Sequence, residues 1–141
     1  MAVNVIVDAK CSYPAACNTV ETLLVHEEAL QIVLPPVAEV LLEKGVSLRC
    51  DGLSKTCLGT KLSSHLRALL QDSTEEDYNA EFVDLVLAIM MVPSLTSAVT
   101  NGAGSIKPLS DSSLKLAIVH INTHSSKHTD CILTSSESAA E

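Results

Sequence analysis

The feature that most limits the fold is a strand, a helix and a second strand in close succession between residues 22 and 50. Thr22 to Val25 is a short apolar run of the kind that forms a buried strand. Glu27 to Lys44 then carries apolar residues at helical spacing, with Gly45 as a stop signal. Val46 to Cys50 is the second strand. This alternation predicts an α/β fold with a mostly parallel sheet and flanking helices.

The segments around this unit carry weaker signals. Met1 to Lys10 fits a strand, because its valines alternate, or a helix, because several of its side chains keep helical spacing. Pro35-Pro36 is predicted to kink or split the long helix. Val83 to Met91 is apolar and predicts another strand. Leu53 to Leu70 is predicted to be helical in its second half, where four leucines share a face. They are Leu62, Leu66, Leu69 and Leu70.

The composition narrows the function classes. A length of 141 residues with 47% hydrophobic content is enough for one packed domain. A net charge of −8 and 2% aromatic residues argue against nucleic acid as a partner. The apolar stretch from Phe82 to Val92 is about half the length of a membrane span, so we interpret it as core. Five cysteines without paired spacing favour a reducing compartment, which is typical of the cytoplasm.

The stretch from Tyr13 to Glu21 carries the strongest chemical signal. Pro14 suits the first position of a helix, and Cys17 would then lie within about one turn of the helix start. Free N–H groups and the helix dipole would favour a thiolate there and stabilise an oxyanion beside the sulfur. Ala15 and Ala16 leave room beside it. Cys17 is therefore either a candidate nucleophile or a buried small hydrophobic residue, as free cysteines often are.

Three strings resemble one enzyme family. Val7 to Lys10 and Tyr13 to His26 are similar to the signature of gamma-glutamyl phosphate reductase, also called glutamate-5-semialdehyde dehydrogenase. His120 to Thr134 resembles the same family's later His-Thr-Asp segment. The family belongs to the aldehyde dehydrogenase superfamily, and Cys17 falls where its nucleophile sits. The resemblance also favours a helix over a strand for Met1 to Lys10, and a strand for Asp130 to Thr134.

The resemblance implies reduction of gamma-glutamyl phosphate to glutamate 5-semialdehyde with NADP(H), a step of proline synthesis. Cys17 would displace phosphate to form a thioester, which hydride from the nicotinamide would reduce. Glu81 more loosely resembles a superfamily glutamate near the nicotinamide ribose, so it is either a cofactor contact or a surface carboxylate. The resemblance further implies a glutamate 5-kinase as partner and a homo-oligomer for the full-length enzyme.

By this resemblance, residues 1–141 are a fragment of an aldehyde-dehydrogenase-like catalytic domain, with residues 1–26 as the nucleophile segment. The cofactor domain and a later Gly-rich motif are missing, so we expect the polypeptide alone to be inactive or misfolded. Ser94 is predicted to start a helix through Val99. Thr100 to Ala117 departs from the family pattern and is interpreted as an atypical insert, either an artefact of the gene sequence or a surface loop.

Several residues carry alternatives. His120, His124 and His128 are spaced so that two share a helix face, which would suit zinc in a non-enzymatic fragment that binds a metal or a protein partner. The resemblance accounts for the same string without a metal. His26 is expected to be a structural residue at a strand end. Asp8 and Lys10 match the family string and are either residues of a solvated helix end or residues with a catalytic role. The acidic run from Gln71 to Asp77 is expected to be a solvated loop.

Overall fold

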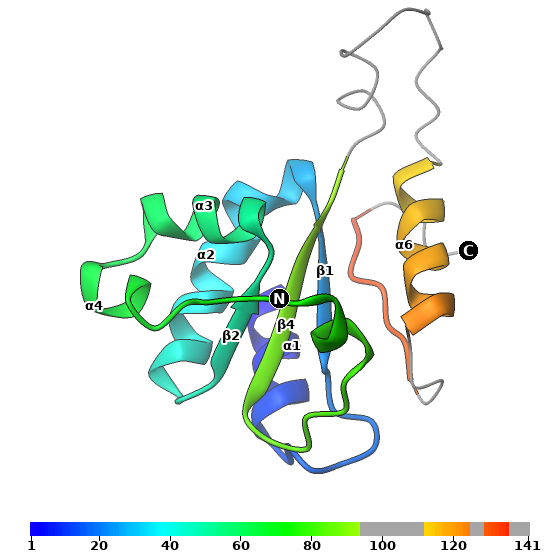
Figure 1. Cartoon of the computed structure of the whole chain (residues 1–141), viewed down its shortest axis with the longest axis horizontal. Helices are drawn as coiled ribbons and strands as arrows, with labels where there is room; N and C mark the ends of the chain where they lie inside the picture. The colour runs from blue at the N-terminus through cyan, green and yellow to red at the C-terminus, as the bar shows by residue number, and fades with distance from the viewer. Residues whose placement is uncertain (94–111, 125–128, 136–141) are drawn as a thin grey trace, which may run out of the picture.

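The computed structural model describes residues 1–93, 112–124 and 129–135 (Figure 1). Its elements follow in chain order. They are α1 (Ala2–Cys11), β1 (Thr22–His26), α2 (Glu27–Glu43), β2 (Ser47–Cys50), α3 (Gly52–Lys61), α4 (Ser64–Arg67), β3 (Gln71–Asp72), the 3₁₀ helix η1 (Glu75–Asn79), β4 (Val86–Val92) and α6 (Ser112–His124).

The four strands of the described chain form one sheet in the order β1-β4-β2-β3, and every pairing is parallel. Leu24 of β1 pairs with Met90 of β4, and Leu48 of β2 pairs with Leu87 on the other side of the same strand. The apolar run of β4 is therefore the centre of the sheet, as suits a strand buried on both faces. The predicted α/β class and parallel sheet are confirmed.

Helices cover both faces of this sheet. Figure 1 shows α2 and α3 on one side and α6 on the other. Helix α2 packs against α1, α3 and three of the strands, so it forms the centre of the larger layer. Its inward side chains and those of β2 and β4 make the core. Fully buried members are Leu34, Val37, Leu41, Leu48, Leu87 and Ile89.

Helix α1 confirms the helical interpretation of the first ten residues, which rested on the family resemblance. Helix α2 runs through Pro35 and Pro36 as one element, so the prolines do not split it. Proline removes a donor and disfavours helix locally, but Leu34, Val37 and Leu41 on either side are fully buried against the sheet. Tertiary packing outweighs the local preference.

Gly45 ends α2 in the way its position predicts. It adopts φ +82°, and the N–H groups of Gly45 and Val46 donate to the carbonyls of Leu42 and Leu41 at 3.0 and 2.9 Å. This is the Schellman arrangement, in which a left-handed residue turns the chain back onto the last helical carbonyls. The turn delivers the chain into β2.

The predicted helix in the second half of 53–70 is confirmed only over the four residues of α4, and the main helix lies in the first half. Asp51 accepts a hydrogen bond from Ser54 N at 3.0 Å and caps α3 directly after β2. Helix α3 ends at Lys61, and only the one-turn α4 follows. Leu69, expected on a buried face, is 52% exposed.

The acidic run is only partly a solvated loop. Asp72 lies in the short edge strand β3 and Glu75 to Asn79 form η1. Asp77 is buried, where its carboxylate pairs with Arg49 and accepts hydrogen bonds from Thr74 at the start of η1. Burial by itself would raise the pKa of Asp77, but the Thr74 and Arg49 hydrogen bonds outweigh it and hold that pKa below its usual value.

The C-terminal predictions are only partly testable. The predicted strand from Asp130 to Thr134 is wrong, because these residues form no strand in the described chain and their side chains are exposed, not packed in the core. Residues 112–117 of the expected insert begin α6, so that part is helical and not irregular. The expected helix from Ser94 to Val99, the rest of the insert and His128 lie outside the described residues. No helix in the described ranges is long and apolar enough to cross a membrane.

Gly45 and Gly52 provide a matched test of the helix stop. A Cβ would meet no atom within 4 Å at either position, but only Gly45 has a positive φ. We expect Gly45→Ala to lower the free energy of unfolding by about 1 kcal/mol, because alanine is strained in the left-handed region. Gly52→Ala should be neutral or slightly stabilising. Equal effects of the two substitutions in urea unfolding would contradict this explanation.

Candidate functional site

The loop between α1 and β1 carries Cys17. Hydrogen bonds from Ala16 N to Tyr13 O and from Thr19 N to Ala16 O, both 3.0 Å, close two successive turns. Pro14 takes the second position of the first turn, where its fixed φ is favoured. Cys17 takes the second position of the second turn, and its side chain is exposed.

No helix forms in this loop, so the predicted helix start at Pro14 and the helix-dipole stabilisation of a Cys17 thiolate are wrong. The Thr19 hydroxyl and the Val20 N–H both donate to the Ala9 carbonyl, at 2.8 and 3.2 Å. These bonds return the chain to the end of α1 before β1 begins. The short segment between the two anchors folds as turns, for which the fixed φ of Pro14 is equally suited.

A small pocket of about 140 Å³ opens beside Cys17. It brings together two predicted site residues, Cys17 and Glu81, that lie far apart in the sequence. Glu21 and Val83 complete the wall together with Thr19 and the small side chains of Ala15 and Ala16. Glu81 is exposed, so the site residues form an open corner and not a closed cavity.

A buried ion pair lies directly behind this pocket. Lys10 Nζ is 2.7 Å from Glu21 Oε2, with the lysine side chain 0% and the glutamate side chain 19% exposed. The solvated role expected of Lys10 is therefore wrong, whereas Asp8 is exposed and accepts a hydrogen bond from the Ser12 hydroxyl at 2.6 Å. Lys10 follows Ile6 by one helical turn, and these two are the buried residues of α1. That spacing is the signal that sequence reasoning missed.

Val83 forms the other side of the pocket in an unusual conformation. Its φ is +53°, which a β-branched residue rarely adopts. Its N–H donates to Glu21 Oε1 at 3.4 Å, so both oxygens of Glu21 have partners. Asp84 continues the turn by accepting a hydrogen bond from Leu85 N at 2.7 Å. Strained backbone of this kind persists only where the surroundings hold it, and it clusters at functional sites.

The five cysteines, all free, differ in chemical environment. Burial, aided by the nearby Asp51, raises the pKa of Cys50 to about 12, and burial also raises the pKa of Cys57. Cys11 is half-buried, whereas Cys17 and Cys131 are exposed. Because a thiolate is the reactive form, Cys50 and Cys57 are poor nucleophiles in the folded chain. Cys131 is the natural comparison for Cys17.

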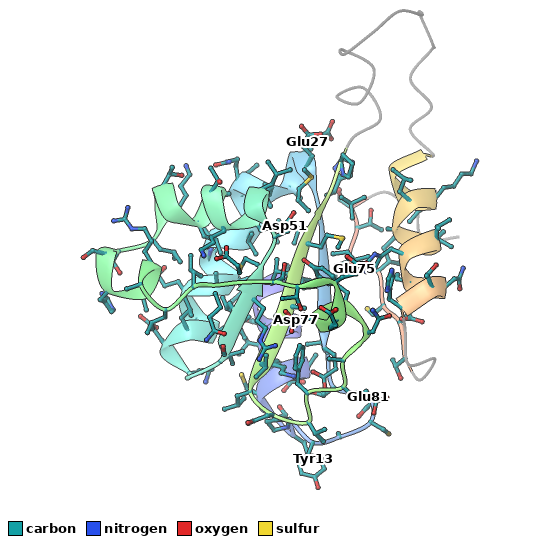
Figure 2. All side chains as sticks on the ribbon, viewed as in Figure 1. Tyr13, Glu27, Asp51, Glu75, Asp77 and Glu81 are labelled. Carbon is teal, nitrogen blue, oxygen red and sulfur yellow. The ribbon has the colours of Figure 1, made fainter. Side chains whose placement is uncertain are left out.

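The pocket lies at the edge of the sheet where β1 and β4 begin. In Figure 2, Tyr13 and Glu81 lie at one end of the molecule, and Glu27 and Asp51 lie at the opposite end. His26 ends β1 at that opposite edge, where its Nδ1 accepts a hydrogen bond from Glu28 N at 3.3 Å and caps α2. His26 therefore has the structural role expected of it and is remote from Cys17.

The histidines of α6 pack on η1. The rings of His120 and His124 are 4.3 Å apart, and His120 meets the Tyr78 ring edge-on at 5.7 Å. His124 Nδ1 is 2.8 Å from Asn79 Oδ1. Within the described ranges, no group of three histidine, cysteine or acidic side chains is placed to hold a metal ion. These histidines join α6 to the sheet layer.

The pocket beside Cys17 is too small to enclose a nicotinamide cofactor. Pockets for ligands of that size have volumes of roughly 300–1,000 Å³. The space beside Cys17 is about 140 Å³ and is open to solvent. Glu81 is the single predicted cofactor contact, and its carboxylate could meet only one edge of such a molecule. No step of the chemistry at this pocket is therefore assigned to a cofactor.

Comparisons with known proteins agree with the family resemblance. No family model matches the chain. A probable gamma-glutamyl phosphate reductase of Schizosaccharomyces pombe is 46% identical over 99% of the chain, and a gamma-glutamyl phosphate reductase of Synechococcus elongatus is 42% identical over 98%. The crystal structure of a gamma-glutamyl phosphate reductase from Thermotoga maritima covers 99% of the chain with a TM-score of 0.74 and 30% identity.

By fold, the described chain is an α/β protein with a parallel sheet, and its structure is similar to that of the Thermotoga reductase. By sequence, it is similar to gamma-glutamyl phosphate reductases over nearly its whole length, and it matches one segment of those proteins. The chain spans about a quarter of the length of these relatives, 26% and 25% of the two named above and 27% of the Thermotoga chain.

The contacts of His120 and His124 predict that the packing of α6 against η1 depends on pH. Burial, followed by the neighbouring His124, lowers the pKa of His120 from 6.5, and Glu75 opposes the shift. Because the pKa of His120 is lower in the folded chain than in the unfolded chain, the stability that neutral His120 contributes is complete above about pH 6.5. This contribution is lost as the pH falls from there toward the pKa of His120 in the folded chain. We expect amide hydrogen exchange in α6, corrected for its intrinsic pH dependence, to accelerate between about pH 7.5 and about pH 5.5.

The matched variant is His120→Phe, which keeps an aromatic ring against Tyr78 and removes the titratable imidazole. In this variant the exchange of α6 should no longer depend on pH beyond the intrinsic effect. Exchange in α2 serves as the internal reference, because its core residues are fully buried away from these histidines. A pH response of α6 no larger than that of α2 in the unmodified chain would contradict the prediction.

Proposed function

We propose that this chain supplies the nucleophilic segment of a gamma-glutamyl phosphate reductase, with Cys17 as the nucleophile. The observation that carries the proposal is the pocket itself, in which an exposed thiol at the tip of a turn meets Glu81 and two small alanines. The names of the relatives, all gamma-glutamyl phosphate reductases, support the same chemistry.

The reaction assigned to Cys17 is acyl transfer from gamma-glutamyl phosphate. The thiolate sulfur forms a bond to the acyl carbon, the carbon–oxygen bond to phosphate breaks, and its electron pair leaves with the phosphate. A thioester remains on Cys17. Its reduction to glutamate 5-semialdehyde needs a hydride, which NADPH supplies in the reaction that the resemblance implies, and the described residues do not hold that cofactor.

The geometry supports this step in two ways. The Cys17 N–H donates no hydrogen bond to any residue that the structure describes, so it is free to stabilise the oxyanion that forms beside the sulfur. The turn places Cys17 between Ala16 and Asn18 at the surface, where an acyl phosphate can approach. Cys50 and Cys57, by contrast, are buried with raised pKa values.

The wider assignments follow from the family. We propose that the chain acts in proline biosynthesis in the cytoplasm, as part of an NADP(H)-dependent enzyme that receives its unstable acyl phosphate from a glutamate 5-kinase. Glu81 is proposed to meet the cofactor ribose in the complete enzyme. The 141 residues alone are proposed not to turn over substrate, because the pocket encloses too little space for the cofactor.

Acetyl phosphate provides a direct test of the acyl transfer, since it presents the same acyl phosphate group to the isolated chain. We expect one acetyl group on Cys17, detected by peptide mass spectrometry, with Cys131 as the exposed control. Cys17→Ser should abolish this thioester, whereas Cys131→Ser should leave it unchanged. Acetylation of Cys131 at the same rate as Cys17, or no acetylation of Cys17 at all, would contradict the proposed function.

A further inference from the structure

An ion pair joins the wall of the Cys17 pocket to the protein interior. Glu21 lines the pocket itself, and Lys10 is fully buried behind it at 2.7 Å. The other charged group in the wall is Glu81, which is exposed. A bare carboxylate at the position of Glu21 would oppose the formation of a thiolate nearby, because like charges disfavour one another. The contact with Lys10 makes the pair neutral.

Glu21 also joins three parts of the chain. Its Oε2 contacts Lys10 in α1, its Oε1 accepts the Val83 N–H, and its backbone carbonyl accepts Ala88 N of β4 at 2.9 Å. Glu21 itself is the last residue of the Cys17 loop before β1. One side chain therefore sets the separation between the loop that carries Cys17 and the segment that carries Glu81.

We propose that Glu21 is the positioning residue of the Cys17 pocket and that Lys10 compensates its charge. The carboxylate holds the Cys17 loop against the Val83 segment, and the ammonium prevents that carboxylate from suppressing the thiolate. This inference rests on the proposed function, in which Cys17 is the nucleophile.

The conformation of Val83 supports the positioning role of Glu21. A β-branched residue at φ +53° requires partners that hold it, and the Glu21 carboxylate is a hydrogen-bond partner that comes from outside its own turn. The adjacent bonds, from Leu85 N to Asp84 Oδ1 and from Val86 N to Asp84 O, are local. Without Glu21, the turn would lose its connection to the Cys17 loop.

The test measures the rate at which iodoacetamide alkylates Cys17 as a function of pH, in the whole 141-residue chain, by peptide mass spectrometry. Lys10→Met leaves an uncompensated carboxylate beside the thiol and should shift the midpoint of the profile upward. Glu21→Gln keeps an acceptor for the Val83 N–H but leaves an uncompensated ammonium, and should shift it downward. We expect each shift to be roughly one pH unit, which is about tenfold in rate near neutral pH.

The remaining variants separate charge from structure. The double variant Lys10→Met with Glu21→Gln should return the midpoint toward that of the unmodified chain, and Lys10→Arg should keep it. Lys55→Met is the matched control, because Lys55 pairs with the exposed Asp72 at the other edge of the sheet. It should leave the Cys17 profile unchanged. Protection of Cys50 and Cys57 from alkylation reports that each variant remains folded.

Opposite shifts in the two single variants support the proposal. Shifts in the same direction with Cys50 and Cys57 still protected, or no shift in a folded Lys10→Met chain, would overturn it. If Lys10→Met exposes the buried cysteines, Glu21→Gln decides by itself, since an unchanged or raised midpoint would contradict the proposal. Alkylation does not depend on acyl phosphate, so a failure of Cys17 to accept acetyl from acetyl phosphate would refute the proposed function without deciding this test.

Discussion

The ion pair between Lys10 and Glu21 is the interaction on which the geometry of the pocket depends. It joins the last turn of α1 to the residue at which the Cys17 loop enters β1, at 2.7 Å and with the lysine fully buried. Removing one member of a buried pair costs about 3–5 kcal/mol, because the other charge remains without compensation. A chain of this size has only about 5–15 kcal/mol of stability in total. Removal of either residue would therefore lower the free energy of unfolding of the whole chain as well as disturb the Cys17 loop.

Much of the fold could be predicted from the sequence, because hydrophobic periodicity and stop signals act locally. The strands β1, β2 and β4, the long helix and its Gly45 stop follow directly from residue pattern. Errors occurred where tertiary contacts outweigh local preference. Burial of Leu34 and Val37 carries α2 through two prolines, and the Asp51 cap starts α3 earlier than the leucine pattern indicates. Asp77 is buried because Arg49 compensates it.

The site was predictable in its residues but not in its geometry. Cys17 and Glu81 were candidates by family resemblance, and they line one pocket. The local argument for Cys17 failed, because Pro14 begins a turn and not a helix, so the helix dipole cannot stabilise the thiolate. Electrostatic control comes instead from groups brought together by the fold. The burial of Lys10 could have been predicted from its helical spacing to Ile6. Nothing in the sequence indicates the left-handed conformation of Val83.

We propose that this segment presents Cys17 as an acyl-accepting nucleophile. The most direct measurement uses a chimera in which this chain replaces the matching segment of the Schizosaccharomyces pombe relative. We expect this chimera to form glutamate 5-semialdehyde from gamma-glutamyl phosphate and NADPH, and to carry a gamma-glutamyl thioester on Cys17 after acid quenching. The Cys17→Ala chimera should form neither. Semialdehyde production that persists in the folded Cys17→Ala chimera would contradict the account.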